Sequence, residues 1–423
     1  MIKFLFKGIL RDKSRSVLPI TIVIIGVALT IVLSGFMRGI MGDMTDQSAR
    51  FQTGHVKIVT KAYEEAMDQM PIDLAILGVD TLLESLRNEY PTLQWVKRTN
   101  FGGLIDVPDA NGETKGQGPA SGMALELFNP NSNEIERMNI LSSIVEGGIP
   151  SKPGEAIIGQ EFASKLKVKI GDEITYVGST MNGSMSFKTF IVRGTIRFGA
   201  SALDKGAIII DISDAQEMLD LEDGSTEILG FLNDGVYVDE KAAALKAEFN
   251  SKADPNDEFA PIMLTLKEQN NLGSYLDMVD VYAGLFVGIF VFAMSLVLWN
   301  TGLLGGLRRY QEFGIRLALG ESKGRIYKNI ILEAVLIGSI GSILGTTLGV
   351  MITIYLQQTG IDISAYLQNS TMMMPSVMRS KFTAQLLYIG FIPGLVAMVI
   401  GNMLSGIGIY KRETATLFKE LEV

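Results

Sequence analysis

A basic segment near residue 310 holds the residues best suited to a specific interaction. It reads Arg308-Arg309-Tyr310-Gln311-Glu312-Phe313-Gly314-Ile315-Arg316-Leu317-Ala318-Leu319-Gly320. On a helix, Arg308 and Arg309 lie four and three positions before Glu312, so the three side chains can share one face. Gly314 and Gly320 bracket residues 315–319, which we expect to form a short helical stretch. A rigid, charged helix of this kind can dock into a groove on a soluble partner, although an ordinary basic loop is the alternative.

Groups that could carry out catalysis are scarce. The chain has 423 residues, no cysteine and one histidine, His55, which excludes a thiolate metal site, a cysteine nucleophile and a cage of several histidines. It has no G-x-x-x-x-G-K-[ST] loop for nucleotide phosphates and no G-x-S-x-G elbow of a serine hydrolase. We therefore expect no enzyme activity, no catalytic residue, no metal site and no cofactor bound by this chain. A formal charge of −9 argues against nucleic-acid binding.

Four apolar stretches are long enough to cross a membrane, which takes about 20 residues in a helix. They comprise residues 17–37, 281–304, 334–356 and 382–410. The first helix is expected to continue outward to about residue 50, and Pro393 is expected to kink the fourth. Residues 1–16 place apolar side chains at helical spacing among basic ones, which favours an amphipathic helix in the inner interface over a plain charged flank.

The distribution of charge predicts which side of the membrane each segment faces. Residues 1–16, 305–329 and 411–423 together hold 14 basic and six acidic residues, whereas the rest of the chain holds 23 and 40. Because basic loops stay in the cytoplasm, we expect both termini and the loop 305–333 to be cytoplasmic. Residues 38–280 and the loop 357–381 are then outside, and the protein is a multi-pass protein of the cell inner membrane with a periplasmic domain.

Residues 38–280 are sufficient for one large domain or two small ones. Alternating apolar residues predict strands, and helical spacing predicts four helices. The expected strands are 55–59, 94–107, 156–159, 173–177, 187–192, 206–210 and 228–238, and the expected helices are 79–88, 160–166, 213–219 and 240–250. The fold class is therefore four transmembrane α-helices plus a large external α+β domain inserted between helices one and two. Within it, residues 147–219 form a β-rich subdomain, and the flanks 51–140 and 225–270 pair with each other.

Three glycines lie four residues apart in the third apolar stretch, namely Gly341, Gly345 and Gly349. A nucleotide-binding loop is the less favoured interpretation, because the glycines lie inside a membrane span. Small residues at this spacing let two membrane helices approach closely. We therefore predict a helix-packing stripe.

The basic segment described first closely resembles the R-x-x-E-[IF]-[GA]-x-x-x-A-x-G signature of FtsX/MacB-type ABC transporter permeases. Residues 154–159 and 171–174 also look like the periplasmic domain of that family, and the order of spans and domain fits it from end to end. In length and layout the chain is most similar to the lipoprotein-release permeases of the LolC/LolE branch. It departs from the family near the C-terminus, where residues 414–417 lack the proline of the usual turn.

The resemblance implies that the chain takes up the stroke of a separate ABC ATPase dimer, which would hold ATP and Mg²⁺, and passes it mechanically to the periplasmic domain. A second copy of the permease or a homologous permease is expected beside it. The implied ATPase-coupling residues are Arg308, Arg309, Glu312, Ile315, Arg316, Leu319 and Gly320.

For the LolC/LolE branch the resemblance implies extraction of lipoproteins from the inner membrane, with a periplasmic carrier as a further partner. A lipid tail needs an apolar entrance, which span one, the start of span two and the outer end of span three could line between two permeases. The candidates at the start of span two are Tyr282, Leu285, Phe286 and Ile289. Ordinary lipid-facing surface explains the same residues equally well, because every span must be apolar. Two other functions stay open, namely MacB-like efflux or peptide export, and an FtsX-like signalling scaffold that activates an external hydrolase.

Overall fold

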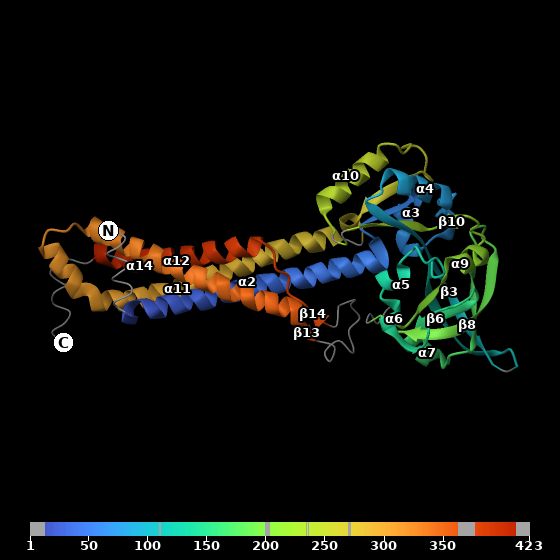
Figure 1. Ribbon diagram of the computed structural model, residues 1–423, viewed down its shortest axis with the longest axis horizontal. Coiled ribbons are helices and arrows are strands. Elements are labelled where there is room, and N and C mark those ends of the chain that lie inside the picture. The colour runs from blue at the N-terminus through green and yellow to red at the C-terminus, as the bar shows by residue number, and fades with distance from the viewer. Residues whose placement is uncertain are drawn as a thin grey trace. The chain divides into compact units, whose positions relative to one another are not determined.

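The computed structural model describes residues 13–109, 111–198, 204–233, 235, 237–269, 272–362 and 377–411. The expected leader therefore lies mostly, and the tail 411–423 almost wholly, outside the described residues. The chain divides into two compact units. We call the unit within residues 1–42, 277–362 and 377–423 the helical unit, and the unit within residues 43–276 the sheet unit (Figure 1).

The long helices are α2 (Lys13–Ser48), α11 (Leu272–Ala318), α12 (Lys323–Thr359) and α14 (Gln385–Lys411). Among the described residues, three helical segments are long and apolar enough to cross a membrane: Ser16–Thr53, Lys323–Thr359 and Gln385–Ile407. In α11 the described apolar stretch, Gly284–Asn300, is shorter. Three of the four predicted spans thus have a matching helix, and the span at 281–304 stays a prediction.

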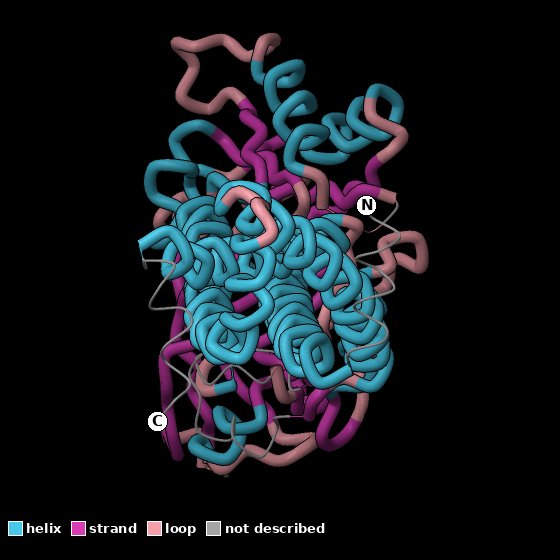
Figure 2. The backbone as a smooth tube through the Cα atoms, turned by 90° about the vertical axis from the view of Figure 1, so that its left-hand side faces the viewer, coloured by secondary structure: helices cyan, strands magenta, loops and turns pink. Residues whose placement is uncertain are grey.

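The helices of the helical unit lie side by side, as the end-on view in Figure 2 shows. Buried apolar side chains from all four helices form one core, which includes Val27 and Ile31 of α2, Leu298 of α11, Ile337 of α12 and Ala397 of α14. A short hairpin of β13 (Ile361–Asp362) and β14 (Val377–Met378) follows α12. The residues between these two strands lie outside the described part of the chain, as does most of the loop expected at 357–381.

The sheet unit is built on a 10-stranded sheet with the order β12-β1-β11-β3-β4-β9-β6-β8-β5, while β7 pairs with both β3 and β8. Two short strands, β2 and β10, form a separate pair. The strands are β1 (Val56–Thr60), β2 (Ile76–Leu77), β3 (Leu93–Pro108), β4 (Thr114–Leu125), β5 (Ile144–Gly147), β6 (Glu155–Gly159), β7 (Glu173–Ser179), β8 (Met185–Ile196), β9 (Ala207–Asp211), β10 (Gly224–Ser225), β11 (Glu227–Leu232) and β12 (Pro261–Thr265).

The long strand β3 belongs to two layers of the sheet unit. Its first half pairs with β11, and β11, β1 and β12 continue as an antiparallel sheet. Helices α4 (Val79–Glu89) and α10 (Asp239–Asn250) share an apolar core with this sheet, to which Leu83, Leu86 and Ala242 contribute. The predicted pairing of the flanking segments is observed here, for residues 56–60, 93–98, 227–232 and 261–265.

The second half of β3 closes a barrel. Going round it, β3 pairs with β4, β4 with β9, β9 with β6, β6 with β8, β8 with β7, and β7 with β3 again. Side chains from all six strands, among them Phe101, Ile158 and Phe190, share one core with α7 (Gln160–Leu166) and α9 (Ile212–Met218). The β-rich subdomain expected at 147–219 therefore also includes residues 99–125, because β3 and β4 complete the barrel wall.

Several predicted elements differ from the observed ones. The strand expected at 228–238 ends at Leu232, because a turn with Gly235 in the left-handed region (φ 69°) follows it. Strands β4, β5 and β12 were not predicted from the sequence. Nor were the short helices α3 (Lys61–Ala66), α5 (Glu134–Arg137) and α6 (Ile140–Ser143).

Candidate functional site

The turn between α11 and α12 is closed by a glycine. After α11 ends at Ala318, Gly320 adopts a left-handed conformation with φ 90°. The Gly320 N–H donates to Leu317 O and the Glu321 N–H to Arg316 O, both at 3.0 Å. This pair of bonds is the Schellman motif, which satisfies carbonyls that a helix end leaves without partners. The predicted coupling residue Gly320 thus has a definite structural role, because other residues rarely adopt this conformation.

An apolar cluster holds the two helix ends together at this turn. Phe313 of α11 and Ile326 of α12 are fully buried against each other, with Leu317 and Ile330 packed beside them. On the opposite side, Ile315 is 57% and Leu319 is 82% exposed. Contiguous exposed apolar surface marks interaction sites in many proteins, which makes these two side chains candidates for a contact.

The stretch between Gly314 and Gly320 is helical, as predicted, and belongs to a longer helix. Helix α11 runs without a break through Gly314 and ends at Ala318, so this stretch is its last turn. Gly314 is accommodated because a single glycine weakens a helix without ending it. Arg308, Arg309 and Glu312 lie on this continuous helix, but their side chains lie outside the described residues. Arg316 is half-buried.

The glycine stripe on α12 lies against α2. A Cβ atom built on Gly341 would come within 2.9 Å of Val23, one on Gly345 within 2.9 Å of Val27, and one on Gly349 within 2.9 Å of Ile31. Contacts this short would force the helices apart, so glycine at each position permits the close packing. Gly390 and Gly394 of α14 face α2 in the same way, through Ile31 and Val27.

A small apolar hollow of about 10 Å³, room for about one water molecule, lies between α2 and α11. Phe286, Val287 and Phe290 line it from α11. From α2 it is lined by Thr30, Leu33, Ser34 and Met37. The Thr30 hydroxyl donates to Gly26 O at 2.8 Å within its own helix, so it does not make the hollow strongly polar. We call these seven residues the α2–α11 groove.

One of the four predicted entrance residues, Phe286, lines this groove. Tyr282, Leu285 and Ile289 are 48%, 57% and 53% exposed on the same helix and are not among the lining residues. Span one was expected to contribute to the entrance, and α2 does line the groove. Leu33 and Met37 were not named individually, because the sequence gives no signal that distinguishes them from any other apolar span residue.

Domain comparisons cover most of the chain. The family model of the MacB-like periplasmic core domain matches residues 16–248, and that of the FtsX-like permease C-terminal domain matches residues 284–414. The chain belongs to the FtsX/MacB-type permease family. Its long apolar helices agree with a membrane permease, and the sheet unit contains most of the region matched by the periplasmic core domain.

Individual relatives of this permease are distant. The lipoprotein-releasing system transmembrane proteins LolC of two Xylella fastidiosa strains, 9a5c and Temecula1 / ATCC 700964, are each 26% identical over 232 residues. The match covers 52% of this chain, and the chain spans about half (54%) of the length of these curated relatives. The periplasmic region of MacB from Actinobacillus actinomycetemcomitans matches 51% of this chain and 91% of its own at 9% identity, with a TM-score of 0.33.

The histidine of this permease has a structural environment. His55 is buried, and its Nδ1 accepts a hydrogen bond from the Leu232 N–H at 3.0 Å. Its ring packs near those of Phe231 and Tyr237. These contacts fit a core histidine that links the start of β1 to the end of β11.

Proposed function

We propose that this chain is the permease subunit of an ABC transporter that extracts lipoproteins from the membrane. In this proposal it has four spans, with both termini and the α11–α12 turn in the cytoplasm and the sheet unit in the periplasm. ATP and Mg²⁺ bind to a separate ATPase dimer, and the chain itself catalyses no reaction. A second permease, identical or homologous, completes the complex.

The observation that carries the proposal is the α11–α12 turn with its two exposed apolar side chains. The buried pair Phe313 and Ile326 and the Schellman motif fix its shape, so the turn can transmit a push rather than yield to it. Ile315 and Leu319 are free to insert into a groove on a partner. Full burial of each would contribute about 1.5–3 kcal/mol to binding.

The α2–α11 groove supports the choice of cargo. Its lining is almost entirely apolar, and it lies between two helices that are expected to face lipid. In this proposal α2 and α11 separate there, and an acyl chain then packs against the lining without desolvating a charge. The names of the curated relatives, lipoprotein-releasing system transmembrane proteins, agree with this choice. A periplasmic carrier that accepts the extracted lipoprotein is the partner expected on the other side.

Photo-crosslinking in whole cells tests the cargo. A photoreactive amino acid is placed at Phe286 in the groove and, as a matched control, at Ile343, an apolar residue of α12 that is 56% exposed and does not line the groove. The proposal predicts cross-links to acylated proteins from position 286 and not from position 343. Depletion of the protein should in addition trap acylated proteins in the inner membrane.

Other outcomes would favour the other functions. Cross-links to unacylated peptides at position 286, with normal lipoprotein sorting after depletion, would favour export of the efflux type. Normal sorting together with loss of an external hydrolase activity would favour the signalling scaffold. Either result contradicts the extraction of lipoproteins.

A further inference from the structure

The outer end of α2 has an unusual conformation and side-chain partners from distant parts of the chain. Beyond Ser48 the helix continues as a π-helical turn, η1 (Ala49–Thr53), and ends at Gly54, whose N–H donates to Ala49 O at 2.9 Å. The last carbonyls of a helix have no partner within it. Two of them are bound here by side chains: Arg98 donates from Nη1 to Phe51 O at 3.1 Å, and Gln269 donates from Nε2 to Thr53 O at 3.3 Å.

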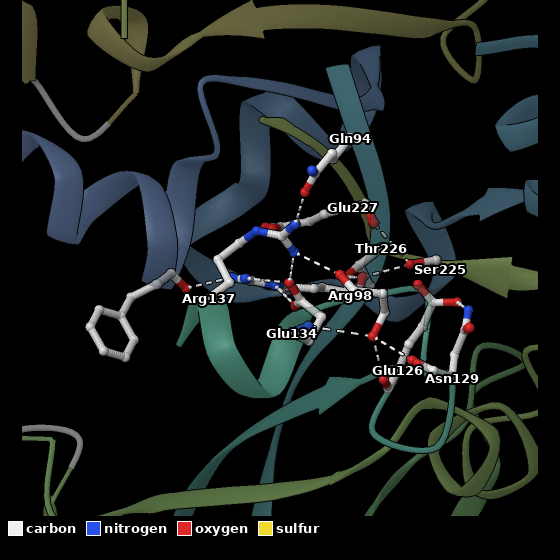
Figure 3. A network of polar contacts seen from close by, with 11 residues as sticks. Gln94, Arg98, Glu126, Asn129, Glu134, Arg137, Ser225, Thr226 and Glu227 are labelled. Carbon is white, nitrogen blue, oxygen red and sulfur yellow. Dashed lines mark hydrogen bonds and ion pairs between the residues drawn. The ribbon is translucent and has the colours of Figure 1, made fainter. Parts of the chain in front are cut away.

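Arg98 joins this helix end to another element. It lies on β3, is 1% exposed, and forms a two-pronged ion pair with Glu134. The bonds run from Nε to Oε2 at 2.6 Å and from Nη2 to Oε1 at 3.2 Å. Glu134 is the first residue of α5 and is fully buried. One guanidinium group thus links the end of η1, strand β3 and helix α5 (Figure 3).

The electrostatics of the cluster favour its position at a helix C-terminus. Arg137 also pairs with Glu134, so two guanidinium groups share this carboxylate. The guanidinium of Arg137 additionally lies 4.2 Å from the ring centroid of Phe231, a favourable cation–π distance. A helix C-terminus carries roughly half a negative charge, which stabilises nearby cations. The end of η1 therefore adds to the stabilisation of these guanidinium groups by Glu134 and Glu126, and a withdrawal of η1 would leave Arg98 buried with one hydrogen bond fewer.

The side chain of Phe51 strengthens the same joint. It packs against an apolar cluster that includes Leu125, Ile157 and Ile209 of the barrel strands. Its ring meets that of Phe198 edge to face, with centroids 6.0 Å apart. Phe51 is therefore bound through its carbonyl to β3 and through its ring to the barrel.

We infer that Arg98 is a positioning residue that holds the outer end of α2 on the sheet unit through its bonds to Phe51 O and Glu134. A displacement of α2 then moves β3 and α5 with it. The inference rests on the proposed function, because it names the contact through which an ATP-driven movement of α2 would be passed to the sheet unit. Helix α2 is continuous from Lys13 to Ser48, and a continuous helix can carry such a displacement along its axis.

A nearby ion pair provides a matched control. Lys57 of β1 and Glu227 of β11 lie 2.9 Å apart, with side chains 4% and 3% exposed. Glu227 is the cross-strand neighbour of Arg98, so the two pairs share one face of the sheet. The Lys57–Glu227 pair joins β1 to β11, whereas Arg98 also binds the end of η1. Its removal should cost stability without loosening the helix end.

The test compares Arg98→Lys with the double variant Lys57→Met/Glu227→Gln in the full-length chain. Lysine keeps the charge beside Glu134 but cannot bind both Glu134 and Phe51 O in the fork geometry of arginine. Amide hydrogen exchange is measured in detergent without nucleotide. We expect exchange of residues 49–55 to rise about tenfold in Arg98→Lys, because a charge-assisted hydrogen bond is lost, and to stay at the wild-type rate in the double variant.

ATP-driven release of acylated protein from membrane vesicles is measured on the same variants with the full complex. The inference predicts a loss of about tenfold for Arg98→Lys and wild-type release for the double variant. Unchanged exchange at 49–55, or faster exchange with wild-type release, would overturn it. If the wild-type protein itself shows no ATP-driven release, the proposed function fails, and the exchange experiment alone then decides whether Arg98 holds the helix end.

Discussion

At the scale of single residues, Gly320 shows how one backbone conformation defines the shape of the α11–α12 turn. Its left-handed backbone lets the chain reverse directly after Ala318, which leaves Leu319 at the tip and returns Ile326 to Phe313. A residue with a side chain would keep the hydrogen bonds only at a cost in backbone strain. The signature of the family contains this glycine, and the structure supplies the physical reason for it.

Substitution of Gly320 by alanine tests this role. We expect a cost of about 1 kcal/mol, because alanine is disfavoured in the left-handed region, and hence about fivefold faster amide exchange at residues 319–322. Gly284→Ala is the control, since Gly284 lies in the same helix and its Cβ would meet open space. Equal exchange at the turn in both variants would contradict a conformational role for Gly320.

Two buried tyrosines and one half-buried tyrosine of the sheet unit make its stability fall at alkaline pH. Burial raises the pKa of Tyr176 to about 12, and it also raises the pKa values of Tyr63 and Tyr237. In the unfolded chain a tyrosine ionises near pH 10. Above about pH 10 the unfolded state therefore releases protons that the folded state retains, and the stability that is fully present below that pH falls as the pH rises.

Tyr176→Phe should make this alkaline loss less steep, by about 1.4 kcal/mol per pH unit between about pH 10 and pH 12. At neutral pH the variant should be about 1 kcal/mol less stable, because the Tyr176 hydroxyl donates to Gly102 O at 2.9 Å. Denaturant unfolding followed by near-ultraviolet circular dichroism over this pH range measures both effects. Tyr275→Phe, at a residue 64% exposed, is the control. An identical alkaline slope in wild type and Tyr176→Phe would contradict the assignment.

At the scale of elements, the packing of α2 against α12 depends on small residues. A side chain at Gly345 would collide with the backbone of Ile24 as well as with Val27. Because two backbones meet there, the conflict cannot be relieved by a change of rotamer alone. The same contacts make α2 a tightly held member of the helical unit.

Gly345→Leu should therefore destabilise the helical unit by at least about 1–3 kcal/mol, the usual range for overpacking. Thermal aggregation of the protein in detergent, compared with wild type, measures the loss. Gly288→Leu adds the same side chain to a position with open space on α11 and should change little. If both variants were equally stable, the stripe would not be a packing device.

The elements also show how far a sequence can predict this fold. Helices α4, α7 and α10 and strand β3 were predicted within about two residues, because their apolar residues follow a clear period. Strand β4 was missed because it contains Gly116, Gly118, Pro119 and Gly122, which disfavour strands. Barrel closure was missed because it depends on the pairing of β3 with β7, which are distant in the sequence.

The candidate site could be predicted only in part, for a similar reason. The coupling residues Ile315, Leu319 and Gly320 could be named from a motif, because the motif is contiguous. The buried pair Phe313 and Ile326 and the α2 side of the groove arise from packing between helices, which apolar composition alone does not specify. Arg98 and Glu134 have no sequence signal either, since buried charges look like surface charges until their neighbours are known.

At the scale of the whole molecule, the charge distribution and the family assignment support the proposed orientation, with the basic segments in the cytoplasm and the acidic sheet unit in the periplasm. The basic segments coincide with both termini and the α11–α12 turn, and the acidic remainder includes the region matched by the periplasmic core domain. The central claim is that an ATPase docks on the α11–α12 turn. Ile315 and Leu319, which are exposed in this chain, would be covered in that complex.

Co-purification from native membranes in mild detergent tests this claim most directly. The tagged wild-type chain is compared with Ile315→Asp/Leu319→Asp and with Leu141→Asp, a control at a leucine of the sheet unit that is 63% exposed. We predict that an ABC ATPase is recovered with the wild type and the control, and that its recovery falls at least about tenfold with the double variant, because two charges would oppose an apolar contact. Equal recovery with the double variant, or no ATPase with the wild type, would contradict the account.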